Sequence, residues 1–368
     1  MSLDKPSKVA IITGGNTGIG FAIAKRLLQV HRDEFTVVLA CRNLQRADDA
    51  RQKLFEFAPG SDIEIVQVDV ESVMSIFKAC DEIKRRFTRI DLFFCNAGIL
   101  LNHGLRWDLV PTMLFTDPVG MLERADLAIQ RKGELTPDGL GRSFECNLFG
   151  HYMMVIETVI LTSIKGQHEQ TATCNNSLIR EFEDLLSTSG DGRIIWTSSS
   201  TSEKDAFNIE DFQAIHSDTP YESSKWATDL TSVYLNKHLA PRNVRSFTTH
   251  PGVVASGIGN LALWIVAART VLHYIFRLCG VTTQTITPAN GSLSNLYVAL
   301  AQPVESLDVG TRYGAHATRM GKPFIVTQPI SGYDESVAAE LAERMERLRD
   351  AFVEERCRNS IKGSGVLN

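Results

Sequence analysis

The chain has few cysteines, and their arrangement argues against the structures that cysteines usually build. There are seven, they are widely scattered, and none is spaced Cys-x-x-Cys. A disulfide framework or a zinc site would need paired or clustered cysteines. We therefore expect free thiols, a reducing compartment and no metal site. The seven are Cys41, Cys80, Cys95, Cys146, Cys174, Cys279 and Cys357.

An excess of positive charge and a secretory leader are missing as well. The formal net charge is -5, whereas a nucleic-acid-binding domain usually carries a basic surface. We expect no nucleic-acid partner. Residues 1–8 are polar and run directly into an apolar segment, without the charged, apolar and cleavage regions of a signal peptide. We expect no passage through the secretory lumen.

The pattern that is present alternates strands with helices. The chain has 368 residues, of which 43% are hydrophobic, so it can bury a large core. Short apolar runs separated by helical patterns predict βαβ units and a parallel sheet covered on both faces. The sequence thus predicts a doubly wound, Rossmann-like α/β fold. The expected strands are 8–13, 35–40, 63–68, 90–95, 193–197 and 244–248.

Two long segments interrupt this alternation. About forty residues, 98–140, precede the expected helix 144–161, and a polar stretch, 165–176, precedes the fifth strand. We interpret the first segment as an insertion with helices. Neither repeats nor linkers divide the chain, so we predict one domain over 1–368. Its cofactor-binding and catalytic core is 8–256, and its extension towards substrate and membrane is 257–368.

A glycine turn follows the first strand and precedes the first helix. Gly14, Gly18 and Gly20 are spaced so that the backbone can approach a pyrophosphate, which the N–H groups of the helix start would bind. The alternative is a tight turn that binds nothing. The strand, turn and helix context favours a dinucleotide site.

Polar side chains occupy the ends of the next three strands. Arg42 follows the second strand, where a site selective for NAD would usually carry an acid, and a guanidinium suits a 2′-phosphate. Asp69 and Asn96 end the third and fourth strands, where ligands bind in such sheets. The cofactor is expected to be NADPH or NADP+. Alternatively, Arg42 is a surface charge and Asp69 a turn residue.

Tyr221 and Lys225 are four residues apart, so they project from one face of a helix. A nearby cation favours the phenolate and lowers the pKa of a tyrosine, which makes it a better acid–base catalyst. Residues 198–200 are serines at a strand end, and one hydroxyl could hold a carbonyl oxygen beside Tyr221. Serine clusters are also common in loops.

Together these motifs resemble the short-chain dehydrogenase/reductases over residues 8–256. The resemblance rests on Thr13-Gly14-x-x-x-Gly18-Ile19-Gly20, Asp69, Asn96-Ala97-Gly98, Asn147, Ser199, Tyr221-x-x-x-Lys225 and Pro251-Gly252. It implies a catalytic tetrad of Asn147, Ser199, Tyr221 and Lys225, with Ser198 as the alternative serine. It also implies that Val254 and Ser256 contact the nicotinamide end. The gaps from Asn96 to Asn147 and from Ser199 to Tyr221 are longer than usual in the family.

Further phrases resemble a narrower group, the 3-keto sterol reductases of the sterol C-4 demethylation pathway, which includes the fungal ergosterol enzyme and the animal type 7 17β-hydroxysteroid dehydrogenase. They are Val66-Gln67-Val68-Asp69-Val70, Ile195-Trp196-Thr197-Ser198-Ser199, Glu210-Asp211-Phe212-Gln213 and Lys225-Trp226-Ala227-Thr228-Asp229-Leu230. This resemblance implies NADPH-dependent reduction of a zymosterone-type 3-keto sterol. It also implies partners in the same pathway, or their scaffold, at the cytosolic face of the endoplasmic reticulum membrane or at lipid droplets.

Two other functions remain open. A broad-specificity carbonyl or retinol-type reductase would carry the same motifs, because they do not encode pocket selectivity. A non-catalytic NADP-binding scaffold is the second, but a scaffold would need neither Tyr221 nor Lys225.

The most hydrophobic run, 261–281, is long enough to span a membrane, but its charges argue against this. Arg269, His273 and Arg277 recur every fourth residue and form one helix face, and Trp264, Ile265, Leu272, Ile275 and Phe276 occupy much of the rest. We expect an amphipathic helix in the headgroup region, with its basic stripe facing anionic lipid. The alternative is a substrate lid packed on the protein. A charged helical pattern, 336–358, is expected to dock on the domain through Ala338, Leu341, Met345 and Leu348.

Overall fold

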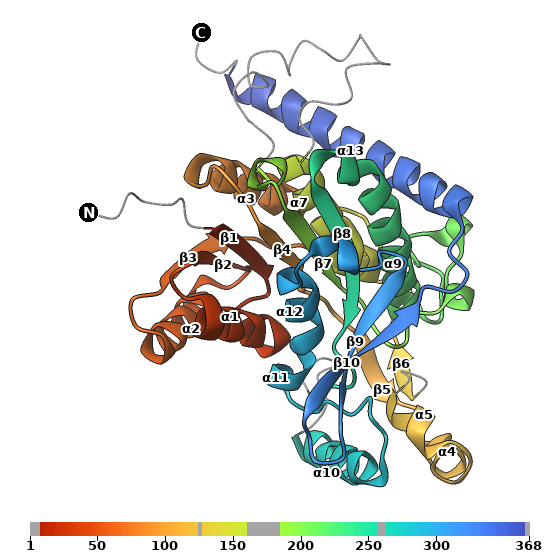
Figure 1. Cartoon of the computed structure of the whole chain (residues 1–368). Coiled ribbons are helices and arrows are strands. Elements are labelled where there is room, and N and C mark those ends of the chain that lie inside the picture. The colour runs from red at the N-terminus through yellow and green to blue at the C-terminus, as the bar shows by residue number, and fades with distance from the viewer. Residues whose placement is uncertain (1–7, 124–126, 160–184, 256–262, 365–368) are drawn as a thin grey trace.

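A computed structural model describes residues 8–123, 127–159, 185–255 and 263–364. At its centre is an eight-stranded sheet in the order β10-β9-β8-β7-β4-β1-β2-β3, shown in Figure 1. Neighbouring strands are parallel except β9 and β10, which pair antiparallel at one edge. The strands are β1 (Lys8–Thr13), β2 (Phe35–Cys41), β3 (Asp62–Gln67), β4 (Leu92–Cys95), β7 (Gly192–Thr197), β8 (Val244–His250), β9 (Thr311–Ala317) and β10 (Pro323–Pro329).

Helices cover both faces of the sheet, because its inner strands are buried on both sides. Along β1, Val9 and Ile11 pack into one core and Ala10 and Ile12 into another, since alternate strand residues point to opposite faces. All of β2 is buried, as expected for an inner parallel strand. The first face carries α3 (Val73–Arg86), α7 (Gly150–Val159), α9 (Pro220–Leu239) and α13 (Glu335–Ser364); the second carries α1 (Gly18–His31), α2 (Leu44–Phe57) and α12 (Leu293–Leu300).

The strand order reverses between β1 and β4. From β1 the chain first builds outward through β2 and β3, then returns to place β4 on the other side of β1. Ligands of such sheets bind outside the carboxyl ends of the strands at this switch point. The doubly wound fold expected from the sequence is confirmed, and the glycine turn after β1 and Asn96 after β4 flank the switch point.

Residues after 256 contribute more to the fold than the sequence predicts. β9 pairs with β8, β10 pairs with β9, and α12 packs on the second core. The seven residues of β9 are all buried although they form no apolar run. Their burial comes from neighbouring elements, so periodicity could not reveal it. The region assigned to substrate and membrane contact therefore also completes the sheet.

The segment 98–140 contains strands as well as helices. β5 (Asn102–Leu105) and β6 (Ala128–Gln130) form a small antiparallel sheet. Between them lie α4 (Val110–Thr116) and α5 (Pro118–Glu123). The insertion thus contains the expected helices and, in addition, two short strands that the sequence did not predict. The polar stretch 165–176 lies outside the described residues.

The helix in the most hydrophobic run, α10 (Leu263–Cys279), faces the opposite way from the expectation. His273 is buried and its Nδ1 lies 2.6 Å from Gln284 Oε1. Burial also lowers the pKa of Arg269. The outward side carries Val271, Tyr274, Ile275 and Leu278, all exposed. The basic stripe thus turns largely towards the protein, because His273 finds a polar partner there. The side chains of Trp264 and Ile265 lie outside the described part.

Within the described ranges, no helix is long and apolar enough to cross a membrane. The same ranges hold six cysteines, all free thiols, and lack any cluster of three His, Cys, Asp or Glu side chains suited to a metal ion. Cys174 lies outside them.

The C-terminal helix α13 docks on the first face as expected. Ala338, Leu341 and Met345 are buried in the core beside α9. Arg349 contributes a buried ion pair with Glu157 of α7 at 3.3 Å. The charged pattern therefore belongs to a helix that closes the core, with its exposed side in solvent.

Candidate active site

Tyr221 and Lys225 lie one turn apart at the start of α9, as their spacing requires. Pro220 occupies the first turn of the helix, where its missing N–H and fixed φ cost nothing. Lys225 extends to the end of β7, where its Nζ donates to the Thr197 carbonyl at 2.8 Å. The same Nζ lies 5.6 Å from the centre of the Tyr221 ring. Helix and strand together hold a cation beside the phenol.

Burial controls the pKa values of this pair. It raises the pKa of Tyr221 to about 12 and lowers the pKa of Lys225 to about 8. The expectation of a lowered tyrosine pKa is therefore wrong for the protein alone. The free-energy cost of removing the phenolate from water is larger than the stabilisation that neighbouring groups give it. Tyr221 is protonated at neutral pH, and Lys225 is mostly cationic.

Asn147 lies in a π-helical turn, Glu145–Phe149, which leads into α7. Its Oδ1 accepts from the Ile99 N–H at 2.8 Å, and its Nδ2 donates to the Ile99 carbonyl at 3.1 Å. The same Nδ2 donates to Ser224 Oγ at 2.9 Å, and Ser224 donates to the Tyr221 carbonyl at 2.7 Å. Single π-helical turns are rare, and those that occur are often found at functional sites. Asn147 thus ties the segment after β4 to the Tyr221 turn.

Gly98 is the point where Asn147 and Lys225 meet. A Cβ at Gly98 would lie 3.0 Å from Asn147 Oδ1 and 3.7 Å from Lys225 Nζ. Three tetrad positions, Asn147, Tyr221 and Lys225, are therefore neighbours. Ser224 was missed by the sequence analysis because a serine between Tyr221 and Lys225 carries no signal of its own.

The two candidate serines point in different directions. Ser198 is buried, and its hydroxyl lies 3.4 Å from the Lys225 carbonyl. Ser199 instead lies close enough to Tyr221 to oppose part of the effect of burial on the tyrosine pKa, and its Oγ lies 2.9 Å from Thr201 Oγ1. Of the two serines that the sequence left open, the geometry favours Ser199.

The turn after β1 is organised by Thr13, which the sequence analysis did not select as a site residue. Its Oγ1 accepts from the N–H groups of Asn96 at 2.8 Å and Ala97 at 3.0 Å. The Asn96 Nδ2 returns a bond to the Thr13 carbonyl at 2.9 Å. His151 Nε2 lies 2.9 Å from the same hydroxyl, and burial lowers the pKa of His151 to about 3, so it is neutral. Asn96 therefore fixes the turn by joining β1 to β4.

Two of the glycines are required by sterics. A Cβ at Gly20 would lie 2.4 Å from the Gly14 carbonyl oxygen, and Gly14 has φ +65°. Gly18 begins α1 with φ +55°, and Ile19 packs on the second core. The first turn of α1 carries no acid, so its N–H groups can face an anion. The turn fits a pyrophosphate.

Arg42 and Asp69 lie beside each other at the ends of β2 and β3. Arg42 Nη1 is 3.7 Å from Asp69 Oδ2 and 3.6 Å from Glu71 Oε2. Glu71 is shared with Arg142, which approaches it at 3.2 Å. Arg42 is 67% exposed, which leaves its guanidinium accessible to a phosphate. An anion there would compete with two carboxylates for it.

Val254 and Ser256 follow the end of β8. Val254 forms a parallel bridge with Ile286, and the Ala255 N–H donates to the Ile286 carbonyl at 2.9 Å. Gly252 has φ +66° and would clash at 2.6 Å with the Ala315 carbonyl if it carried a Cβ. Ser256 lies outside the described residues.

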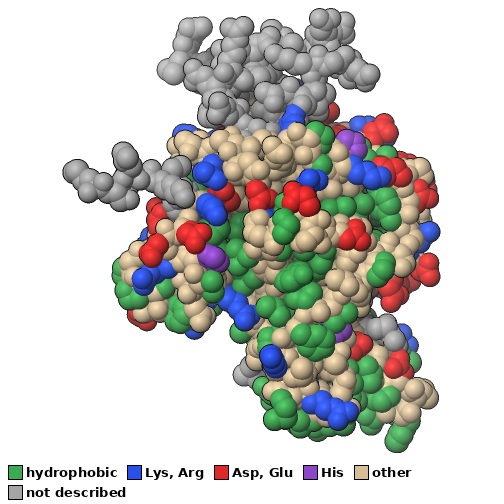
Figure 2. Space-filling view, in the orientation of Figure 1, with side chains coloured by type: hydrophobic (Ala, Val, Ile, Leu, Met, Phe, Trp, Pro, Cys, Tyr) green, Lys and Arg blue, Asp and Glu red, His purple; other side chains and the backbone are tan. Residues whose placement is uncertain are grey.

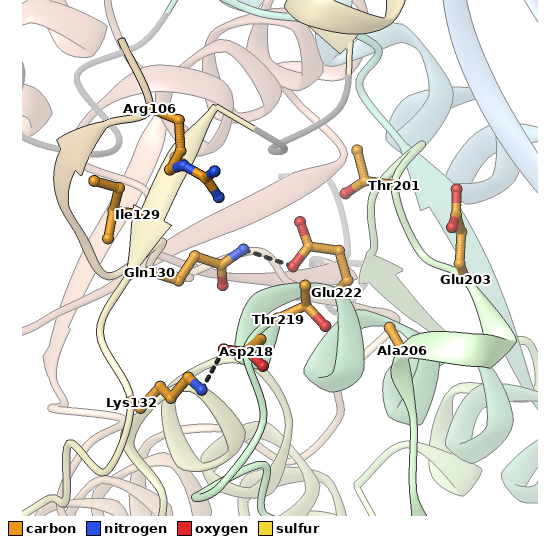
Figure 3. A pocket seen from close by; sticks show the side chains of 11 residues that line it. Arg106, Ile129, Gln130, Lys132, Thr201, Glu203, Ala206, Asp218, Thr219 and Glu222 are labelled. Carbon is orange, nitrogen blue, oxygen red and sulfur yellow. Dashed lines mark hydrogen bonds and ion pairs between the residues drawn. The ribbon is translucent and has the colours of Figure 1, made fainter. Parts of the chain in front are cut away.

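A cavity of about 470 Å³ lies beside the start of α9 (Figure 3). Its walls come from β6, from the loop after β7 and from Thr219 and Glu222 on either side of Tyr221. The lining includes an ion pair between Lys132 and Asp218 as well as the apolar side chains of Ala128, Ile129 and Ala206. This cavity therefore offers both polar groups and apolar surface beside the start of α9.

The sequence resembles known proteins over nearly its whole length. It is 34% identical to the 3-keto-steroid reductase/17-beta-hydroxysteroid dehydrogenase 7 of Homo sapiens, covering 92% of this chain and 92% of that protein. It is 31% identical to the 3-keto-steroid reductase of Schizosaccharomyces pombe, covering 88% and 90%. A sequence profile described as short chain dehydrogenase matches residues 8–168.

Solved structures agree on the fold. The L-sorbose reductase from Gluconobacter frateurii, complexed with NADPH and L-sorbose, superposes with a TM-score of 0.52 at 18% identity, covering 85% of this chain and 97% of that one. Actinorhodin polyketide ketoreductase with NADPH gives a TM-score of 0.51 at 18% identity, covering 83% and 95%. With the relatives, the profile and the Tyr221–Lys225 site in agreement, the chain belongs to the short-chain dehydrogenase/reductase family of oxidoreductases.

Proposed function

We propose that this protein uses NADPH to reduce the 3-keto group of a zymosterone-type sterol intermediate to the 3-hydroxy sterol in sterol biosynthesis. The observation that carries the proposal is Tyr221 placed between Lys225 and Ser199. The names of the relatives, 3-keto-steroid reductase over most of both chains, support the choice of substrate.

In the proposed reaction Tyr221 donates the proton to the substrate oxygen. Its pKa of about 12 keeps it protonated at neutral pH. Ser199 holds the same oxygen, and the Lys225 cation stabilises the phenolate that remains. Asn147 is placed to support Lys225 through a water molecule, since both side chains meet at Gly98.

The cofactor, when bound, supplies the hydride. Arg42 supports a preference for NADPH over NADH, because a guanidinium suits the 2′-phosphate. Lys225 and Tyr221 would contact its nicotinamide ribose. The other residues that we propose to hold it are Gly14, Gly18, Ile19, Gly20, Asp69, Asn96, Val254 and Ser256.

Steady-state kinetics with purified protein test this function. We expect a 3-keto sterol to be reduced with a higher kcat/KM than small aldehydes, and NADPH to be preferred to NADH. Tyr221→Phe should lower kcat by about 100- to 10,000-fold, the usual contribution of a general acid, while NADPH still binds. Equal efficiency on all carbonyls would instead support a broad-specificity reductase. Loss of less than a few-fold in Tyr221→Phe would show that Tyr221 is not the proton donor, whereas absence of ketone reduction by the wild type would support an NADP-binding scaffold.

We also propose that the protein docks on a membrane through α10 and its surroundings. Val271 and Leu278 are 59% and 58% exposed on the outward side of α10, and Phe115 of α4 is 86% exposed. Figure 2 shows hydrophobic side chains at the lower end of the molecule, where Figure 1 places α10 and α4. Arg277 lies over the Tyr274 ring at 4.8 Å, at the border of the apolar face.

This arrangement supports insertion of the exposed apolar side chains into a membrane, with Arg277 beside them to face anionic headgroups. We propose the cytosolic face of the endoplasmic reticulum membrane as its location, with peripheral or monotopic attachment, and lipid droplets as a second surface of the same chemistry. A sterol ketone dissolves in that phase, so the other enzymes of C-4 demethylation, or their scaffold, are the proposed partners.

Flotation with phosphatidylcholine vesicles, with and without phosphatidylserine, tests the docking face. We expect Val271→Glu with Leu278→Glu to weaken flotation at least about tenfold, since each side chain stabilises insertion by about 1.5–3 kcal/mol. Val30→Glu, on α1 and also exposed, is the matched control. A double variant that floats as strongly as the wild type would refute the docking face.

A further inference from the structure

The two segments that lengthen this chain relative to the family pattern pack against each other. The first, residues 98–140, precedes Asn147; the second, residues 199–219, connects Ser199 to Tyr221. The Gly133 N–H donates to the Ile215 carbonyl at 3.0 Å, and the Gly141 N–H donates to Gln213 Oε1 at 3.0 Å. An ion pair joins Lys132 to Asp218. These contacts join residues 98–140 and 199–219 in one interface, here called the seam. The cavity lies along it.

Gln130, at the end of β6, extends from this seam to the catalytic helix. Its Oε1 accepts from the Tyr221 N–H at 3.0 Å, and its Nε2 donates to Glu222 Oε2 at 2.7 Å. Gln130 and Glu222 are both only 9% exposed. Figure 3 shows the two side chains directed at each other across the cavity wall. One amide thus binds both residues at the start of α9.

The start of α9 needs such a partner. The first N–H groups of a helix have no acceptor within the helix, and a capping side chain usually supplies one. The residue at the cap position, Thr219, makes no side-chain cap bond. Gln130 takes over this task for Tyr221 from a distant segment. It also donates a hydrogen bond to the buried Glu222 carboxylate.

We propose that Gln130 is a positioning residue: by clamping Tyr221 and Glu222, it fixes the start of α9 and holds the Tyr221 hydroxyl in line with Ser199. The proposal rests on the proposed role of Tyr221 as proton donor. Because Gln130 belongs to the inserted seam, the seam and the catalytic tyrosine move together. A ligand that shifts β6 would therefore shift the phenol as well.

The first test removes the amide. Gln130→Leu keeps the size of the side chain but loses both hydrogen bonds, and we expect kcat to fall about 10- to 100-fold, as for misplacement of a reacting group by about 1 Å. The KM for NADPH should stay within about twofold, because the glycine turn is remote from β6. Gln213→Leu is the matched control, since it loses an amide in the same seam without touching α9. Its kcat should stay within about threefold of the wild type.

Hydrogen exchange supplies a readout that does not depend on substrate. In Gln130→Leu the amide of Tyr221 loses its acceptor, so the peptide that contains it should exchange at least about tenfold faster. The peptide should exchange normally in Gln213→Leu. Unchanged exchange, or kcat within twofold of the wild type, would overturn the proposal.

Gln130→Glu separates positioning from general loss of stability. The introduced carboxyl group can share a proton with Glu222 at acid pH and preserve the clamp, whereas two carboxylates repel at higher pH. The remaining charges around the cavity are Arg106, Lys132, Glu203 and Asp218. We expect activity relative to the wild type to fall as pH rises from 5 to 8, and Gln130→Leu to show no such trend. A parallel decline of both variants would contradict the clamp.

The same experiments distinguish failure of the clamp from failure of the sterol assignment. If the wild type reduces small carbonyls but no 3-keto sterol, the substrate proposal fails, while a loss of kcat on those carbonyls in Gln130→Leu still supports the clamp. If sterol reduction is normal in Gln130→Leu, the clamp fails and the proposed function stands.

Discussion

Tyr221 and Lys225 are both affected by burial, but with different results. The phenol becomes a weaker acid and the ammonium a stronger acid. A tyrosine with a pKa of about 12 is a poor donor by itself. In the proposed mechanism, donation is possible because the phenolate forms beside Lys225, a buried cation whose field is only weakly screened. In this mechanism, proton donation by Tyr221 depends on the positive charge of Lys225.

The pH dependence of ketone reduction should therefore report Lys225. The lysine is charged below its pKa of about 8 and neutral above it. We expect kcat to be level at lower pH and to fall as pH rises through about 8, while Tyr221 remains protonated until about 12. Measurement of kcat from pH 6 to 10 tests this expectation.

Lys225→Arg is the control for this decline of kcat at high pH. A guanidinium stays charged throughout this range, so the decline should move to higher pH even where kcat is lower. If the decline of kcat stays at the same pH in Lys225→Arg, a group other than Lys225 causes it.

Several site residues were identified from sequence, and others could not be. Tyr221, Lys225 and the glycine turn occur as local patterns, so spacing alone was sufficient. Thr13 and Gln130 act on residues far away in the chain; Thr13 belongs to the glycine motif, which does not reveal these contacts, and no motif contains Gln130. The choice between Ser198 and Ser199 depends on which way adjacent side chains point after a strand, which a sequence does not specify.

At the scale of elements, the turn between β1 and α1 leaves no room for a side chain at Gly20. Gly20 lies in the first turn of α1, where its backbone faces the Gly14 carbonyl. The contact leaves no space for a Cβ. The nearest atom is a backbone oxygen, which cannot move aside as a flexible side chain could.

Gly20→Ala should consequently disrupt cofactor binding. A Cβ at 2.4 Å from the Gly14 oxygen must push α1 away from the turn, and we expect the Kd for NADPH to rise at least about tenfold, which equals 1.4 kcal/mol. Titration of NADPH fluorescence measures it.

Gly60→Ala is the control, since open space surrounds that glycine and only its φ of +85° is strained. It should lower stability by about 1 kcal/mol and leave the Kd unchanged. Unaltered NADPH binding in Gly20→Ala would show that the turn does not contact the cofactor.

Elements were predictable where burial follows from their own residues. β1, β2 and β7 each contain a short apolar run and were found nearly to their ends. β9 was missed because Thr311–Ala317 is buried by its neighbours. For α10 the two faces could be predicted but not their orientation, since the buried partner of His273, Gln284, lies on a later segment.

At the scale of the whole molecule, α13 closes the core beside α9, so the last helix supports the catalytic one. Leu341 is fully buried there. The helix is far along the chain from Tyr221, yet its apolar side shares the first core with Trp226 and Leu230 of α9.

Leu341→Ala should accordingly destabilise the whole domain. Truncation of a buried leucine costs about 2–5 kcal/mol through lost burial and the cavity left behind. Urea denaturation followed by circular dichroism should show a lower midpoint. Arg347→Ala is the control, because that side chain is mostly exposed in a surface ion pair, and it should change stability by less than about 0.5 kcal/mol. A midpoint equal to the wild type in Leu341→Ala would mean that α13 unfolds separately.

The π-turn at Glu145–Phe149 has a consequence for how this site tolerates insertions and deletions. It accommodates one residue more than an α-helical turn would. Loss of a single residue just before Asn147 could convert it to regular helix without breaking the chain. Each residue of an α-helix advances by about 100°, so Asn147 would be replaced at the Ile99 backbone by a neighbour. A one-codon deletion would then leave a well-formed helix and a sheet that still binds nucleotide, but with Lys225 lacking its amide neighbour.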